Sequence, residues 1–151
     1  VVTLAKAMGN GMPIGACWAR RDVSAVFQPG DHGSTYSGTA LATAAVSAVV
    51  DEMRRIDAPR RAREQGARFA ELLSAIPQVE SVRGAGLLLG AQLAADVDAP
   101  TVYRHLLEHG LICNAVNSTT LRFAPPLTVT EAELVEAAGL VEAALRTEVP
   151  A

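Results

Sequence analysis

The chain has 151 residues, a formal net charge of −3 and a hydrophobic content of 50%, which predict a folded globular protein and exclude a disordered polymer. The acidic balance provides no general attraction for nucleic acid or for an anionic membrane. No apolar run reaches the roughly 18 residues that span a bilayer, and the amino terminus lacks a signal-peptide pattern. Cys17 and Cys113 form no metal-ligand spacing, so we expect two buried thiols in a reducing compartment, the cytoplasm.

The first segment, VVTLAKAMGNGMPIG, contains Lys6, the only lysine among 13 basic residues. A guanidinium stays protonated in proteins, whereas a primary amine can lose its proton and attack a carbonyl. Lys6 is therefore a candidate Schiff-base lysine, and the alternative is a lysine at a strand end with its amine in water. Residues 1–4 are predicted to end a buried strand. Gly9, Gly11 and Gly15 then allow the backbone to approach a ligand closely.

Residues 29–38 form a loop by composition, and a helix is predicted over 39–55. The hydroxyl groups of Ser34 and Thr35 are either turn formers or part of an oxyanion site, since N–H groups before a helix can face a phosphate. Thr39 is suited to cap the helix. Because the helix is apolar almost all round, we expect it to be buried on several sides, at a subunit or domain boundary.

The next part of the chain predicts a helix to about residue 76, strands over 79–84 and 86–93, and a helix from 100 to 109. Arginines between 54 and 68 interleave with acidic residues at helical spacings, which favours an ion-paired helix face over a nucleic-acid patch. His105 and His109 are four residues apart, but two ligands do not complete a zinc site, so no metal is predicted.

Two further strands are predicted over 111–115 and 119–124. In the second, alternation puts Arg122 on the face opposite to its two apolar neighbours. Arg122 either faces solvent or uses its planar guanidinium to hold a carboxylate by paired hydrogen bonds. The last helix follows a capping box formed by Thr130 and Glu133.

Three segments resemble the marker motifs of the class III aminotransferases that depend on pyridoxal 5′-phosphate (PLP). They are the lysine segment TLAKAMGNGMPIGA, the loop GDHGSTYSGTALA and the strand LRFAPPL. They occur in the order of the family and cover nearly the whole chain. Within the family, the loop and the segment NAVNSTTLRFAPPLTVT are most similar to acetylornithine and succinylornithine aminotransferases.

The resemblance implies an α/β protein with the fold type I of PLP-dependent transferases. Residues 1–56 are then the end of the large PLP-binding domain, and residues 57–151 are the small carboxyl-terminal α+β domain. The implied reaction transfers an amino group from N-acetylornithine, or from a similar ω-amine, to 2-oxoglutarate, as in arginine biosynthesis. The implied assembly is a homodimer with shared active sites.

The resemblance also implies a role for each candidate residue. Lys6 holds the PLP cofactor as a Schiff base and moves a proton during the reaction. Thr35 binds the cofactor phosphate of the neighbouring subunit, and Ser34 lies against the substrate. Arg122 binds the α-carboxylate of the substrate or a carboxylate of 2-oxoglutarate.

The sequence departs from the family at residues 36–40, where the family more often has Phe-Gly-Gly-Asn-Pro, and this leaves the substrate preference open. Another class III enzyme, such as ornithine aminotransferase, 4-aminobutyrate aminotransferase or an aminomutase, is one alternative. An inactive fragment that only pairs with a partner chain is another. Because Val1 begins inside a predicted strand, we expect the chain to be the carboxyl-terminal portion of a longer aminotransferase.

Overall fold

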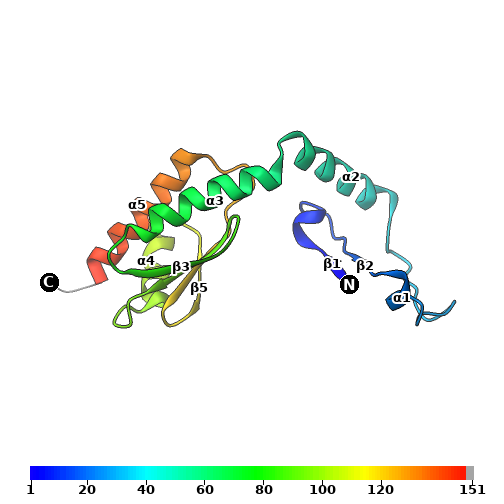
Figure 1. Cartoon of the computed structure of the whole chain (residues 1–151), viewed down its shortest axis with the longest axis horizontal. Helices are drawn as coiled ribbons and strands as arrows, with labels where there is room; N and C mark the ends of the chain where they lie inside the picture. The colour runs from blue at the N-terminus through cyan, green and yellow to red at the C-terminus, as the bar shows by residue number, and fades with distance from the viewer. Residues whose placement is uncertain (149–151) are drawn as a thin grey trace. The chain divides into compact units, whose positions relative to one another are not determined.

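The computed structural model describes residues 1–148, and the chain divides into two compact units, Val1–Asp57 and Ala58–Ala151 (Figure 1). Asp57 is the last residue of the first unit and has a left-handed backbone with a φ of 50°. Helix α3 (Ala58–Ser74) begins directly after it. Pro59 lies in the first turn of α3, where its missing N–H costs nothing.

The first unit contains a two-stranded antiparallel sheet and one long helix. The sheet pairs Val2 with Trp18 and Leu4 with Ala16. The predicted helix over 39–55 is confirmed to within one residue. The elements of this unit are β1 (Val2–Leu4), the 3₁₀ helix η1 (Lys6–Met8), β2 (Ala16–Trp18), α1 (Arg21–Ser24) and α2 (Ala40–Arg55).

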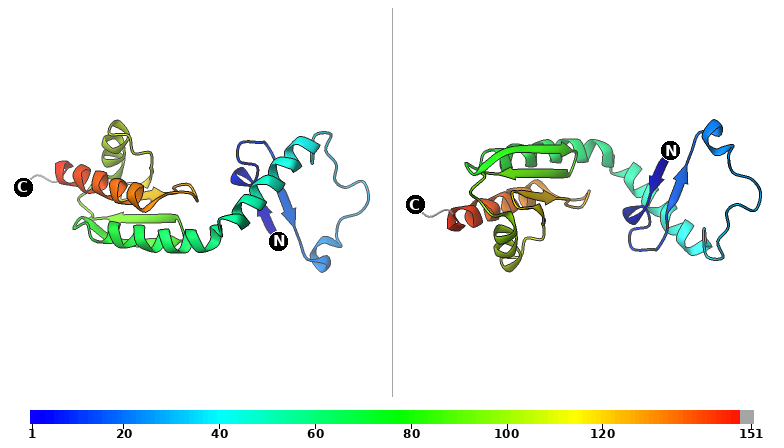
Figure 2. Two further views of the ribbon diagram at one scale, coloured as in Figure 1. Left: turned by 90° about the horizontal axis from the view of Figure 1, so that it is seen from above. Right: turned by 90° about the horizontal axis from the view of Figure 1, so that it is seen from below.

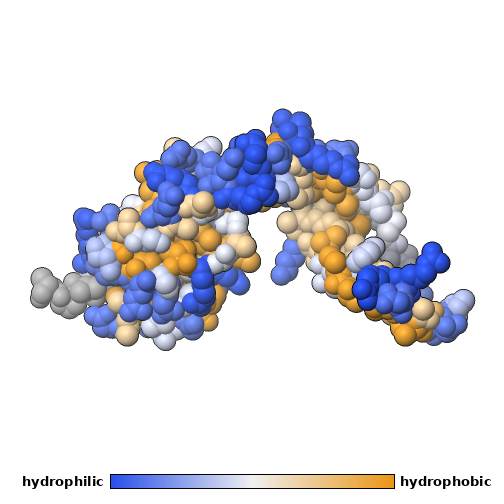
Figure 3. All heavy atoms as spheres, viewed as in Figure 1, coloured by the Kyte–Doolittle hydropathy of each residue, from blue (hydrophilic) through white to orange (hydrophobic). Residues whose placement is uncertain are grey.

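Residues 1–57 do not themselves provide the burial that was predicted for this unit. Val2 and Leu4 of β1 are 47% and 52% exposed, and only Ala42 of α2 is buried. Figure 3 shows hydrophobic residues, in orange, on the surface of the unit. A two-stranded sheet buries little apolar surface by itself, and residues 1–57 supply no layer that covers it. Cys17 lies on β2 and is exposed as well, so these residues do not provide its predicted burial either.

The second unit is built on a four-stranded antiparallel sheet with the strand order β3-β4-β6-β5. Both predicted hairpins are present, but β5 begins three residues later than expected. The reason is that the N–H of Leu111 still donates to the carbonyl of Leu106, at 2.9 Å, and closes the preceding helix. The strands are β3 (Val79–Ala85), β4 (Leu88–Leu93), β5 (Asn114–Asn117) and β6 (Thr120–Phe123).

Three helices pack on one face of this sheet and enclose the core. The views in Figure 2 show α3 running along β3 and β4, while α4 (Ala99–Glu108) contacts β5 and β6. Helix α5 (Glu131–Glu148) packs against both helices. The predicted helices are confirmed, and each one buries a stripe of apolar side chains in the core. The largest buried side chains include Phe69, Leu73, Leu93, Leu106, Leu121, Leu134 and Leu145.

Hydrogen bonds at the surface of the second unit fix the helix ends. The capping box is confirmed, because the N–H of Thr130 donates to the Glu133 carboxylate at 2.7 Å and the N–H of Glu133 donates to the Thr130 hydroxyl at 3.3 Å. On α3, Arg60 pairs with Glu64 and Arg68 pairs with Glu71. The ion-paired helix face is therefore confirmed. Among residues 1–148, no helix combines the length and the apolar character needed to cross a membrane.

Candidate active-site residues

Lys6 is the first residue of η1, two positions after the last residue of β1, and has a left-handed backbone with a φ of 53°. A non-glycine residue in this conformation costs on the order of 1–3 kcal/mol and persists only where its surroundings hold it. The turn holds it here, since the N–H of Gly9 donates to the carbonyl of Lys6 at 3.0 Å. The Lys6 side chain is exposed. Residues 1–57 therefore do not bury this amine.

A hollow of about 360 Å³ lies beside the turn segment of the first unit. Its walls come from residues 13–15, from the loop after α1 and from Ala42 of α2. Ser34 lines this hollow, together with Tyr36, Ser37 and Gly38. Thr35 and Lys6 are not among its lining residues. The structure thus brings the glycine segment and the hydroxyl loop together, and Ser34 is the predicted site residue that faces the space between them.

The helix that follows the hydroxyl loop begins without a side-chain cap. Thr39 occupies the N-cap position of α2 but makes no capping hydrogen bond, so its expected capping role is wrong. The nearby hydroxyl of Thr43 bonds within the helix, to the carbonyl of Thr39 at 3.0 Å. The first turn also contains no acidic residue. Its N–H groups therefore lack side-chain partners, and the positive end of the helix dipole suits an anion.

Arg122 lies on β6 of the second unit, on the face of the sheet that carries no helix. Its neighbours Leu121 and Phe123 are buried in the core, whereas Arg122 is exposed, so the predicted alternation is confirmed. The guanidinium borders a hollow of about 520 Å³. Pro125 and Pro126 follow the strand.

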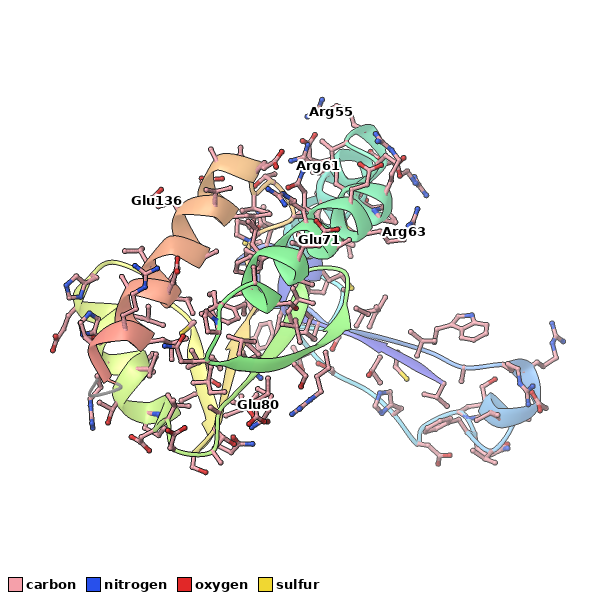
Figure 4. The ribbon with its side chains drawn as sticks, turned by 60° about the vertical axis from the view of Figure 1, so that its left-hand side comes forward. Arg55, Arg61, Arg63, Glu71, Glu80 and Glu136 are labelled. Carbon is pink, nitrogen blue, oxygen red and sulfur yellow. The ribbon has the colours of Figure 1, made fainter. Side chains whose placement is uncertain are left out.

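The loop that follows β6 is fixed from α3. The Arg61 side chain (Figure 4) donates to the carbonyls of Leu127, Thr128 and Val129 at 3.2 to 3.4 Å. A partly buried polar pair supports β6 itself, because the Thr120 hydroxyl donates to Gln92 Oε1 at 2.9 Å. The strand that presents Arg122 is therefore anchored at its start and just beyond its end.

Arg83 was missed by sequence reasoning, although it lines the same hollow as Arg122. It lies on β3 and is exposed. The sequence shows Arg83 as a second arginine in a predicted strand, but only the strand register brings Arg83 and Arg122 to one face. His105 and His109 do not line this hollow. Their rings stack on each other, with centroids 4.3 Å apart.

Cys113 is the second predicted thiol, and it is half-buried beside β5. Burial raises the pKa of the Cys113 thiol to about 11, although a backbone hydrogen bond at Asn114 acts in the opposite direction. The thiol is therefore protonated at neutral pH and is a poor nucleophile. Cys113 packs with the core and takes no part in the candidate site.

The fold is shared with solved aminotransferases. An acetylornithine aminotransferase from Elizabethkingia anophelis superposes with a TM-score of 0.82 at 30% identity, over 96% of this chain and 38% of that one. An ornithine aminotransferase from Toxoplasma gondii, whose active site holds PLP at partial occupancy, superposes with a TM-score of 0.84 at 30% identity. That match covers 97% of this chain and 36% of the other. The predicted α/β aminotransferase fold is therefore confirmed.

The sequence identifies the family. The class-III aminotransferase family matches residues 1–145, so the chain belongs to the class-III aminotransferases. An acetylornithine aminotransferase from Caldanaerobacter subterraneus is 40% identical over 146 residues, which are 94% of this chain and 37% of that relative. The chain thus spans little more than a third of the length of this curated relative.

Proposed function

We propose that the protein transfers an amino group from N-acetylornithine, or from a similar ω-amine, to 2-oxoglutarate, with PLP as cofactor. The observation that carries this proposal is Lys6, the single lysine of the chain, held in a left-handed turn at the end of β1. Membership of the class-III aminotransferases supports the reaction type. Similarity to acetylornithine aminotransferases supports the donor and, with it, a role in arginine biosynthesis. The cytoplasmic location remains a prediction from the sequence.

The donor set of the first unit fits PLP chemically. The primary amine of Lys6 can bond to an aldehyde carbon, which no guanidinium of the chain can do. The hydroxyl loop and the uncapped N-terminus of α2 can bind a phosphate. In our proposal Thr35 binds the phosphate held by the neighbouring subunit, and Ser34 contacts the substrate. The cofactor supplies the electron sink, and the protein supplies binding, orientation and charge.

With PLP bound, Lys6 would be the base that holds and moves a proton at the reacting carbon of the substrate. Proton transfer by a positioned base is worth on the order of 10² to 10⁴ in rate. A lysine can accept a proton only when it is neutral, and burial is one way to favour the neutral amine. Because Lys6 is exposed within this chain, we propose that residues outside it, including those of a second subunit in a homodimer, cover the amine.

Arg122 holds a substrate carboxylate in this proposal. Its guanidinium presents paired donors that match the two oxygens of a carboxylate, and the anchored strand holds it at the rim of a hollow. A carboxylate-bearing acceptor such as 2-oxoglutarate provides this group.

A second candidate is an ornithine aminotransferase. It is favoured by the similarity to the Toxoplasma gondii enzyme. Glutamate formation from 2-oxoglutarate, measured with N-acetylornithine, ornithine and 4-aminobutyrate in parallel, separates the candidates. The donor with the highest kcat/KM identifies the activity.

The role of Lys6 is tested by trapping. The protein is mixed with PLP and reduced with borohydride, and the modified peptide is identified by mass spectrometry. We expect one cofactor adduct on Lys6. Lys6→Arg is the matched control, because it keeps the charge but cannot attack a carbonyl. Equal labelling of the wild type and of Lys6→Arg, for example at the amino group of Val1, would refute the proposed role.

A further inference from the structure

Arg83 and Arg122 lie in one cross-strand row of the second unit. Arg83 on β3 is paired with Gly90 on β4, and Gly90 is paired with Arg122 on β6. Side chains of directly paired residues project from the same face of a sheet. The two arginines therefore share the face opposite the helices, two strands apart, with backbones roughly 10 Å from one another.

Gly90 leaves open the space between the two arginines. A Cβ built at this position would lie 3.8 Å from Cγ of Arg83 and 3.6 Å from Cγ2 of Thr120. Both distances are ordinary contacts, so the Arg83 side chain runs past Gly90. The hollow of about 520 Å³ over this row also has apolar walls, which include Leu88 and Val116. Leu88 is 58% exposed, although it is a leucine in a strand.

Neither guanidinium has a partner within the part of the chain that the structure describes. No hydrogen bond or ion pair of residues 1–148 involves the side chain of Arg83 or Arg122. Other arginines do have such partners, for example Arg55, which pairs with Glu52 at 2.6 Å. Two like charges at one hollow repel each other unless an anion lies between them. The row thus has the charge and the space for a ligand with two negative groups.

We propose that Arg83 is a second substrate-binding residue, which together with Arg122 binds a dicarboxylate, with one carboxylate at each guanidinium and the aliphatic carbons against Leu88 and Val116. The inference rests on the proposed function for the identity of the ligand as the amino acceptor. It makes Arg83 a residue that determines specificity for dicarboxylates over monocarboxylates. The anion site itself requires neither the cofactor nor Lys6.

The test measures binding of glutarate and butyrate to the protein without cofactor, by isothermal titration calorimetry. Both ligands have three aliphatic carbons next to a carboxylate, but butyrate lacks the second carboxylate. We expect glutarate to bind about tenfold more tightly, from one additional charged hydrogen-bonded pair. Arg83→Gln should reduce glutarate binding to the level of butyrate and leave butyrate binding unchanged.

Arg63→Gln is the matched control, because Arg63 on α3 (Figure 4) is exposed and does not line the hollow. It removes the same charge and should leave the preference for glutarate intact. Gly90→Val keeps both charges but fills the space between them, and it should abolish the preference while the circular dichroism spectrum is unchanged. A preference for glutarate that survives Arg83→Gln, or that is lost equally in Arg63→Gln, would overturn the inference.

The outcome is distinguishable from failure of the proposed function. Because no PLP is present, the absence of an adduct on Lys6 leaves the binding result unaffected. Conversely, loss of the preference for glutarate leaves the trapping of Lys6 unaffected.

Discussion

Gly66 of α3 provides a sharp test of the packing between the helix and the sheet of the second unit. A Cβ at this position would lie 2.0 Å from the carbonyl oxygen of Gly86, and 2.4 Å from its carbon, in the turn between β3 and β4. Both atoms belong to the backbone, so neither can rotate away. The helix can approach this turn closely only because residue 66 has no side chain.

Two effects of Gly66→Ala oppose each other. Alanine stabilises a helix interior by about 1 kcal/mol relative to glycine. Forcing a methyl group into a filled space costs about 1–3 kcal/mol, and an approach of 2.0 Å places the cost at the upper end. We therefore expect a net loss of about 1–2 kcal/mol in the free energy of unfolding.

The assay is urea denaturation followed by circular dichroism. Gly139→Ala is the matched control, because Gly139 lies within α5, is exposed, and has nothing within 4 Å of a built Cβ. That variant should be more stable than the wild type by about 1 kcal/mol. If Gly66→Ala were as stable as Gly139→Ala, the close approach between α3 and the turn would be absent in solution.

Two further predictions concern titratable groups. In a Cys17→Ser variant, Cys113 should react with iodoacetamide at about pH 8 on the order of a hundredfold more slowly than free cysteine. The reason is that its pKa of about 11 leaves little thiolate. A reaction rate that levels off below about pH 9 would contradict this prediction. The N–H and then the hydroxyl of Thr130 hold the pKa of Glu133 below its ordinary value of 4.5. The stabilisation is therefore present above about pH 4.5 and is lost as the pH falls through the lowered pKa, so Glu133→Gln should flatten the acid limb of a urea-midpoint profile.

The second unit could be predicted from the sequence because the packing and hydrogen-bonding partners of its helices and strands lie within the same unit. The stripe of α3, the alternation in β6 and the capping box of Thr130 each indicate a buried face or a hydrogen bond that residues of the same unit complete. The first unit is different. The apolar pattern of β1 and α2 indicates burial, but residues 1–57 contain no layer that packs over these elements.

The candidate site could be predicted from the sequence only in part. Lys6 stands out by composition, and Arg122 by its place in an alternating strand. Arg83 could not be paired with Arg122 from the sequence, because a shift of one residue in strand register moves a side chain to the other face of the sheet. The pairing of both arginines with Gly90 places them on one face, and this pairing is known only from the folded sheet.

The exposure of Lys6 constrains how the proposed site works. Residues 1–57 leave the Lys6 side chain exposed, so they do not shield its amine from water. If a second subunit covers this amine, the amine becomes reactive only when the dimer forms. The yield of the PLP adduct on Lys6 should then rise with protein concentration, in parallel with the dimer fraction. Trapping followed by mass spectrometry, in parallel with analytical ultracentrifugation, measures both quantities. An adduct yield that stays constant while the dimer dissociates would show that the turn around Lys6 alone makes the amine reactive.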